Sequence, residues 1–205
     1  MGTAELIVDP RRLIQHERVQ QERLRQVAAA LARDGIRVPI AVTPVGEDRY
    51  FVLDGAHRST AAAQLGMAGV PCTVVELGEE PRIEGWTHRV GGVRLSAAVE
   101  TSVLTGRGDG PVVATVRAFG RCWRARAADD SPIAVHRAFH QVGELYRHLP
   151  YERERVPVAG AWGQVTWSIP RWDDLVELVS RFGPLPAGVT RFEIERRVAE
   201  LPIAA

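Results

Sequence analysis

The segment YFVLDGAHRS at residues 50–59 constrains the fold most, because an apolar run passes through a glycine directly into a helical pattern. Residues 50–53 predict a strand, and residues 56–66 predict a helix that ends at a second glycine. The other elements predicted for this half are a helix at 20–33 and strands at 5–9, 39–43 and 70–76. Strands alternating with helices indicate an α/β fold, in which ligands bind where a strand ends and a helix begins.

The second half of the chain also mixes strand and helix patterns. It predicts two strands and then two amphipathic helices, in the order 112–116, 122–127, 135–149 and 172–181. A domain boundary is predicted within the glycine-containing stretch at 85–92. We therefore expect a ligand-binding core at residues 1–90 and an α/β extension at residues 91–205 that completes the site.

The composition excludes several classes of nucleotide enzyme. The chain has 26 basic residues, all of them arginine, and it contains neither lysine nor asparagine. A P-loop and a Schiff-base site each need a lysine, and the catalytic machinery of protein kinases needs both residues. Acidic residues number 25, so the net charge is only +1. Such a balance gives no general attraction to nucleic acid or to anionic lipid, and we expect neither as a partner.

Cysteine content and hydropathy bear on the compartment. The two cysteines, Cys72 and Cys122, form no C-x-x-C pair, and we expect buried free thiols in a reducing cytosol, with a single disulfide as the alternative. No signal peptide and no run of 18 apolar residues is present, so a cytoplasmic protein is expected. The sequence gives no indication of the oligomeric state.

The turn at residues 54–60 carries the strongest chemical signal. A glycine lets the backbone approach a ligand, and the following helix directs free N–H groups and its positive dipole end at that ligand. The residues predicted to hold phosphate groups here are Gly55, His57, Arg58, Ser59 and Thr60. Asp54 precedes them and would bind Mg²⁺ or a substrate hydroxyl. The alternative interpretation is that Asp54 and Ser59 only cap the helix.

Two further clusters have simpler explanations. The potential ligands on the third predicted helix, His136, His140, Glu144 and His148, are spaced four apart and predict a solvated polar face rather than a metal site. The arginines between Arg117 and Arg126 form a basic patch near Phe119 and Trp123, and we interpret it as a salt-bridged surface strand.

The motif DGAHRSTAA resembles the ParB/sulfiredoxin-like superfamily, in which such a turn holds nucleotide phosphates. Sulfiredoxins carry a reactive cysteine where this chain has Ala56, which excludes that chemistry. ParB proteins usually have Glu-Arg-Arg after the glycine and a helix-turn-helix, and neither is recognisable here. The chain is most similar to the free L-serine kinases of this fold. The shared features, in chain order, are His16-Glu17, Asp54 to Arg58, Val70-Pro71, Trp86 and Thr190-Arg191.

The resemblance implies a kinase that transfers a phosphoryl group from ATP or ADP, with Mg²⁺, to the hydroxyl of free L-serine or a related hydroxy amino acid. The product would be O-phosphoserine or a relative. In this scheme Glu17 is the general base and Asp54 is catalytic and holds the metal. Thr190 and Arg191 join the turn in binding the nucleotide, and the amino acid is bound by His16, Glu22 and Trp86.

Two departures from the family pattern leave the donor nucleotide and the acceptor open. A second histidine of the family is Ala56 here, and the family's C-terminal lysine and Thr-Arg-His correspond to residues 188–192, which read Gly-Val-Thr-Arg-Phe. The alternative function is a ParB-like regulator that binds nucleotide and DNA without kinase activity. In that case the patch between Arg117 and Arg126 would be functional, and Glu17 would be dispensable.

Overall fold

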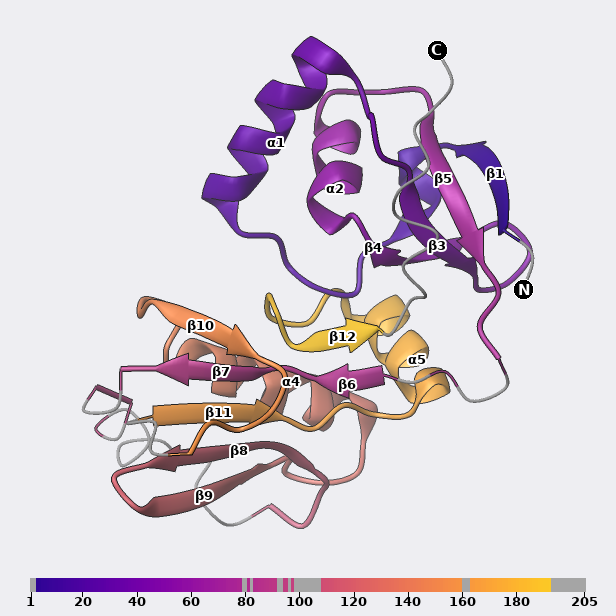
Figure 1. Ribbon diagram of the computed structural model, residues 1–205. Coiled ribbons are helices and arrows are strands. Elements are labelled where there is room, and N and C mark those ends of the chain that lie inside the picture. Colours follow the sequence, from indigo (N-terminus) through magenta and orange to yellow (C-terminus); the bar gives the residue numbers. More distant parts are fainter. Residues whose placement is uncertain are drawn as a thin grey trace. The chain divides into compact units, whose positions relative to one another are not determined.

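In the computed structural model, the described residues are 3–78, 81, 83–91, 94–95, 97, 108–159 and 163–192. The chain forms two compact units (Figure 1). The first comprises Met1–Arg82 and Phe192–Ala205, and the second comprises Ile83–Arg191. The stretch at 85–92, where the sequence predicted a boundary, contributes strands to the second unit. The division at residue 90 into two domains stays a prediction.

The first unit contains a mixed five-stranded sheet. Its strands are β1 (Thr3–Val8), β2 (Leu13–Ile14), β3 (Ile40–Pro44), β4 (Tyr50–Asp54) and β5 (Val70–Val75). Their order is β1-β5-β3-β4-β2, with β3 parallel to β5 and antiparallel to β4. A short 3-10 helix at Pro10–Arg12 leads into β2, which pairs in parallel with β4. This arrangement places the loop after β2 beside the strand that ends at Asp54.

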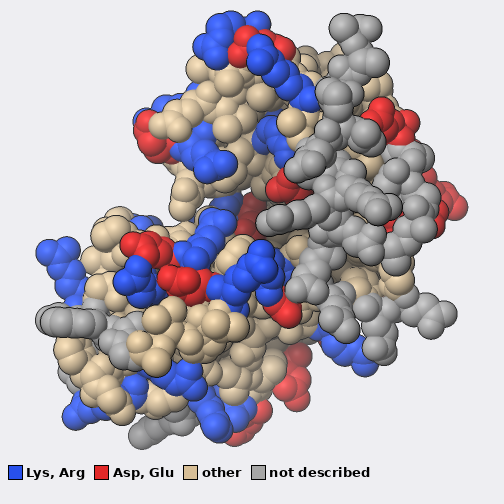
Figure 2. All heavy atoms as spheres, in the orientation of Figure 1, with Lys and Arg blue, Asp and Glu red and all other residues tan. Residues whose placement is uncertain are grey.

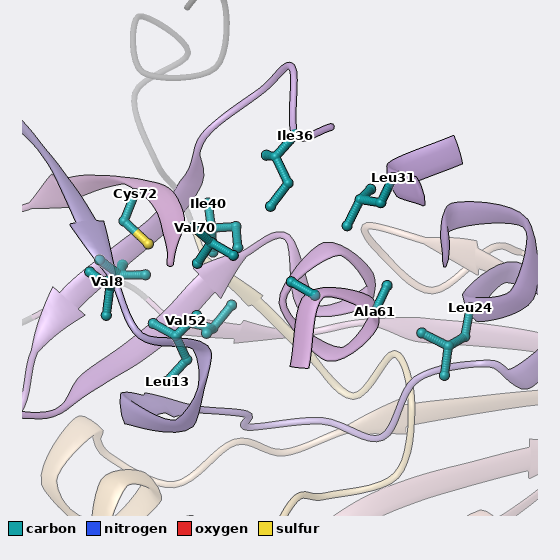
Figure 3. Close-up of a cluster of buried hydrophobic side chains, with 12 residues drawn as sticks. Val8, Leu13, Leu24, Leu31, Ile36, Ile40, Val52, Ala61, Val70 and Cys72 are labelled. Carbon is teal, nitrogen blue, oxygen red and sulfur yellow. The ribbon is translucent and has the colours of Figure 1, made fainter. Parts of the chain in front are cut away.

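Two helices pack side by side in this unit, α1 (Gln21–Asp34) and α2 (Ala56–Gln64) (Figure 1). Leu24 and Leu31 are the buried positions of α1, two turns apart, which is why the helix forms an apolar stripe. The buried side chains between the helices and the sheet form one core (Figure 3), which includes Val8, Leu13, Leu24, Leu31, Ile36, Ile40, Val52, Ala61, Val70 and Cys72. This core fixes the end of β4 against the start of α2.

The second unit is built on an antiparallel five-stranded sheet of order β10-β7-β11-β8-β9. Its strands are β7 (Thr87–Val90), β8 (Val112–Ala118), β9 (Arg121–Arg126), β10 (Tyr151–Glu154) and β11 (Gly163–Trp167). Helix α4 (Pro132–Glu144) packs on β8 and β9 and against helix α5 (Trp172–Phe182). A separate two-stranded pair joins β6 (Ile83–Gly85) to β12 (Thr190–Phe192).

The predicted α/β fold is confirmed, and so are the long elements of both halves. The sequence analysis missed β2, β6 and β12, because two or three residues carry too little periodicity to be recognised, and it also missed the longer strands β7, β10 and β11 of the second unit. The third predicted helix ends at Glu144 rather than continuing to 149, although Tyr146 of the following turn is buried as its apolar spacing implied.

The prediction for the two cysteines is half right. Both thiols are free, and Cys72 is buried, where desolvation raises its pKa to about 12. Cys122 is exposed, which corrects the expectation of two buried thiols. It lies on β9, an edge strand of its sheet, and pairs there with Arg117. Among the described residues, none of the helices is both long and apolar enough to cross a membrane.

Candidate functional site

The turn between β4 and α2 has the geometry that the sequence predicted. Gly55 is the N-cap of α2 with φ +97° and ψ +23°, a left-handed conformation that favours glycine. As a glycine, this cap residue supplies no side-chain cap. The first N–H groups of a helix lack carbonyl partners within the helix and lie at the positive end of its dipole, which is the arrangement that binds phosphate groups in many proteins.

Arg58 folds back over this turn and holds it in place. Its Nη2 donates a hydrogen bond to Oδ2 of Asp54 at 2.9 Å. Its Nη1 donates to the carbonyl oxygen of Pro39 at 2.7 Å and also to that of Val38. The guanidinium thus links the end of β4 to the loop before β3. Arg58 is a structural clamp as well as a cation beside the helix N-terminus.

The two hydroxyls that were predicted to bind phosphate take part in hydrogen bonds within the unit. Ser59 is buried, accepts a hydrogen bond from the side-chain amide of Gln15 and lies 3.1 Å from the carbonyl oxygen of Ala56. The Thr60 hydroxyl donates to the same carbonyl at 2.8 Å. Ser59 therefore connects the loop after β2 to the first turn of α2.

His57 connects the turn to the start of α1. Its Nε2 accepts a hydrogen bond from the backbone N–H of Gln20, the N-cap residue of that helix, at 3.3 Å. The starts of α1 and α2 are consequently tied to each other. This contact fixes the imidazole at the same end of α2 as Gly55.

His16 lies inside the first unit, although the sequence assigned it to the substrate. It is 6% exposed, and its Nδ1 is 2.7 Å from the carbonyl oxygen of Val52. Its ring stacks on Phe51 with 5.4 Å between the centroids, and Phe192 meets it edge-on at 5.1 Å. Burial lowers the pKa of His16, and the nearby carboxylate of Glu17 opposes this effect without reversing it.

Glu17 follows directly and is itself largely enclosed, with 12% of its side chain exposed. Its Oε1 lies 3.9 Å from Nε2 of His16. Glu22, in contrast, lies on the outer surface of the first turn of α1, with 72% of its side chain exposed and an ion pair to Arg25 at 2.7 Å. Within the first unit, the structure therefore sets Glu17 beside His16 and leaves Glu22 in solvent.

The remaining predicted residues belong to the second unit and form a cluster of their own. The guanidinium of Arg191 lies over the ring of Trp86, 5.5 Å from its centroid, and forms an ion pair with Glu84. The backbone N–H of Trp86 donates to the carbonyl oxygen of Val189 at 3.0 Å. Thr190 is buried in the same strand as Arg191. The two residues that the resemblance assigned to nucleotide binding thus share a strand, with Trp86 beside it.

The sequence analysis missed His88, which contacts the chain just before the strand of Thr190 and Arg191. His88 is buried, and its Nε2 lies 2.6 Å from the carbonyl oxygen of Gly188. Its Nδ1 lies 2.6 Å from the hydroxyl of Tyr146, and its ring stacks on Tyr151 at 4.1 Å. Since a carbonyl can only accept, Nε2 carries the proton and Nδ1 accepts from Tyr146. The one local signal was the exposed Arg89 between His88 and Val90, which is a short alternation typical of a strand.

Asp54 is the residue of the turn that could hold a metal ion. Its carboxylate is exposed at the end of β4, and Arg58 is bonded to only one of its oxygens. Within the described ranges, no three His, Cys, Asp or Glu side chains gather into a metal-binding cluster. Mg²⁺ beside phosphates is commonly held by one or two carboxylates, with phosphate oxygens and water as the other ligands. A single exposed carboxylate at a turn that is predicted to bind phosphate fits that pattern.

Comparison with known sequences finds relatives of the first unit. Residues 3–85 match the ParB N-terminal domain. The chain is 29% identical over 84 residues to an ATP-dependent L-serine kinase of Desulfurococcus mucosus, covering 40% of this chain and 33% of that protein. It is 40% identical over 77 residues to the ATP-dependent L-serine kinase SbnI of Staphylococcus aureus, covering 37% and 30%. The matched segments span about a third of the length of these curated relatives.

A weaker match is a probable chromosome-partitioning protein ParB of Pseudomonas putida, 34% identical over 62 residues, covering 30% of this chain and 21% of that protein.

Solved structures extend the likeness to the whole chain. SbnI of Staphylococcus aureus, truncated at its C-terminus, superposes with a TM-score of 0.76 at 24% identity, covering 97% of this chain and 86% of that one. A free serine kinase in complex with AMP gives a TM-score of 0.67 at 17% identity, covering 91% and 86%. Residues 3–85 thus match the ParB N-terminal domain, and the chain has the fold of SbnI and of the free serine kinase.

Proposed function

We propose that this protein is a free-serine kinase that transfers a phosphoryl group from ATP to the hydroxyl of L-serine or a related hydroxy amino acid. The observation that carries the proposal is the glycine turn that begins α2, which Arg58 links to Asp54 and to the loop before β3, in a chain with the fold of SbnI. Phosphoryl transfer asks a protein mainly for positioning and for neutralisation of charge, which this turn supplies. The names of the curated relatives favour ATP over ADP as the donor.

In this proposal the first unit supplies the chemistry. Glu17 takes the proton from the acceptor hydroxyl, and its enclosed carboxylate is suited to that task. The amides of the first turn of α2, with His57 and Arg58, hold the phosphates, while the Ser59 and Thr60 hydroxyls shape the turn. Mg²⁺, held by Asp54, would neutralise charge on the phosphates.

The second unit supplies further binding groups in the proposal. Arg191 is a forked donor suited to phosphate, and the face of Trp86 packs on it and borders the amino acid. Thr190, on the same strand, lines the nucleotide site.

Glu22, in the first unit, is exposed and paired with Arg25, so its proposed role toward the ammonium group of serine requires that it leave that ion pair.

The direct test is incubation of the protein with Mg²⁺, L-serine and either ATP or ADP, followed by phosphorus NMR. The expected result is a phosphomonoester resonance that matches O-phosphoserine and accumulates with ATP. L-threonine and L-homoserine, assayed in parallel, would define the acceptor class. Absence of any phosphomonoester with all three acceptors and both nucleotides would overturn the proposal.

The alternative is a ParB-like regulator, which the ParB N-terminal domain itself and the basic strand β9 favour. Basic and acidic side chains are interspersed over the face of the molecule drawn in Figure 2, which weighs against a broad DNA-binding surface. Salt-dependent binding of duplex DNA, together with absence of phosphorylated product, would favour this alternative. The substitution Arg124→Ala should then weaken DNA binding, whereas it should leave a serine kinase unaffected.

A further inference from the structure

The imidazole of His16 is held in one orientation and in one tautomer. Val52 offers its Nδ1 only a carbonyl oxygen, which accepts and cannot donate, so Nδ1 carries the proton. Phe51 covers one face of the ring, and Phe192 meets it edge-on. Stacking keeps the plane of the ring, and turning the ring over within that plane would lose the hydrogen bond to Val52. In the neutral ring, Nε2 is left as a bare acceptor.

This acceptor lies beside the proposed base. Nε2 of His16 is 3.9 Å from Oε1 of Glu17, about 1 Å longer than a hydrogen bond. A small rotation of the Glu17 side chain would close that gap. The charged groups that act on the ring are the carboxylates of Glu17 and of Asp54, the second already paired with Arg58. Burial keeps the ring neutral at pH 7 in spite of both carboxylates.

We propose that His16 is a positioning residue for Glu17: its Nε2 accepts a hydrogen bond from the Glu17 carboxyl group after that group has taken the proton of the acceptor hydroxyl. The inference rests on the proposed kinase function. The acceptor oxygen loses its proton to Glu17 as it bonds to the phosphorus of the nucleotide's terminal phosphate, and the bond from that phosphorus to the leaving nucleotide breaks. The proton stays on Glu17, bonded to His16, and passes to water after product release.

The consequence is that His16 strengthens the base without touching serine. An ionised Glu17 gains nothing from a bare nitrogen lone pair, whereas a protonated Glu17 gains a hydrogen bond. The hydrogen bond therefore favours the state that follows proton transfer, and with it the transition state. This role differs from the substrate contact that the resemblance implied for His16, and the two predict different kinetics.

Two substitutions of His16 test the roles of the two ring nitrogens separately. In His16→Asn, the side-chain amide nitrogen is as many bonds from Cβ as Nδ1 is, so the bond to Val52 can be kept while the acceptor is lost. In His16→Gln, the amide group lies at the position of Nε2, so an acceptor can be kept while the bond to Val52 is lost. We expect His16→Asn to lower kcat about tenfold, the size of one lost hydrogen bond, and to lower Tm because the ring contacts with Phe51 and Phe192 are lost. His16→Gln should lower Tm more and kcat less.

The values of KM for serine and Kd for ATP should not change in His16→Asn, and the acidic limb of its pH profile should move to lower pH, because protonated Glu17 has lost a partner. The control is His148→Asn, at an exposed position of the second unit, which should leave every parameter unchanged. A raised KM at unchanged kcat would mean a direct substrate contact, and an unchanged kcat would mean a purely structural histidine. Either result overturns the inference and leaves the kinase function standing.

Nitrogen NMR of the imidazoles tests the same contact without any assay of activity. The His16 resonances, identified by their loss in His16→Asn, should report a neutral ring protonated at Nδ1. In Glu17→Gln, the amide can donate permanently to Nε2, and that resonance should shift. A proton on Nε2, or an Nε2 resonance that does not respond to Glu17→Gln, would overturn the inference even in an active kinase. The expected spectra from a protein that does not phosphorylate serine would overturn the proposed function alone.

Discussion

The guanidinium of Arg58 lies against Gly55, with Nη2 3.1 Å from the position that a Cβ atom would occupy on that glycine. Gly55→Ala should therefore be harmful in two ways. Its φ of +97° strains any residue with a side chain, and the added methyl group would push the guanidinium away from its carbonyl partners. We expect weaker ATP binding, by about tenfold or more for a displaced charged donor, measured by calorimetry.

Gly46 offers a matched control for this substitution. It has the same φ of +97°, but no atom lies within 4 Å of the position of its Cβ. Gly46→Ala should thus show the cost of the backbone strain alone, about 1–2 kcal/mol of unfolding free energy, with ATP affinity unchanged. Equal affinities in Gly55→Ala and Gly46→Ala would show that the contact with Arg58 has no part in nucleotide binding.

Glu17→Gln tests the proposed base. The amide keeps the size of the side chain but cannot take a proton, so turnover should fall by roughly 10²–10⁴-fold while ATP affinity is kept. Single-turnover phosphorylation of serine, with calorimetric titration of ATP, measures both quantities. Glu47→Gln, in the exposed turn between β3 and β4, is the control and should behave as the unmodified protein. Undiminished turnover in Glu17→Gln would exclude this mechanism even if the protein is a kinase.

Arg58→Ala should lower both the unfolding free energy and the affinity for ATP, because this side chain clamps the turn and is also proposed to bind phosphate. Removing it leaves the carbonyl oxygens of Val38 and Pro39 without their donor, at a cost of about 1–3 kcal/mol of unfolding free energy. Loss of the cation should also weaken ATP binding. Arg33→Ala, an exposed arginine paired with Asp34, is the control and should change stability by less than about 0.5 kcal/mol. Binding that weakens with no loss of stability would show that the clamp is not formed in solution.

Asp54→Asn tests the proposed metal ligand. An amide is a poor ligand for a hard cation, so turnover should fall at least as far as in Glu17→Gln. The residual rate should depend more steeply on the Mg²⁺ concentration. The control is Asp48→Asn, which removes an exposed carboxylate from the turn between β3 and β4. A residual rate with the Mg²⁺ dependence of the unmodified protein would argue against metal binding at Asp54.

The turn at residues 54–60 could be predicted from the sequence because its cause is local. An apolar strand, a glycine and a helix-forming run determine that turn wherever the chain leads next. The inward direction of the Ser59 hydroxyl could not be predicted, since it depends on Gln15, 44 residues away along the chain. The position of His16 could not be predicted either, because its partner Val52 lies 36 residues away along the chain.

In the second unit, still more of the structure depends on partners that are distant in the sequence. Strand β10 reads Tyr-Glu-Arg-Glu, and its place at the edge of the sheet follows from pairing with β7, more than 60 residues earlier. Nothing in such a charged run predicts a strand, since its support is the partner rather than its own periodicity. The buried role of His88 likewise needs Tyr146 and Gly188, at separations of 58 and 100 residues.

His88 makes the stability of the protein depend on pH. Burial lowers its pKa to about 4, against an ordinary value of 6.5, and the hydrogen bond to Gly188 opposes that shift only in part. Between pH 4 and pH 6.5, His88 is protonated in the unfolded chain but neutral in the folded protein. Stability is therefore full above about pH 6.5 and is lost as the pH falls toward 4, by about 2 kcal/mol between pH 7 and pH 5 from this residue alone.

His88→Gln isolates the contribution of that residue, because the amide can still donate to the carbonyl of Gly188 and does not titrate. Urea unfolding at pH 7 and pH 5 should show a less stable variant at pH 7 and a smaller loss of stability on acidification than in the unmodified protein. His148→Gln should keep the full loss, since that histidine is exposed. If His88→Gln and the unmodified protein lose the same free energy between the two pH values, then His88 is not the buried neutral group that holds Gly188 and the strand of Arg191 in place.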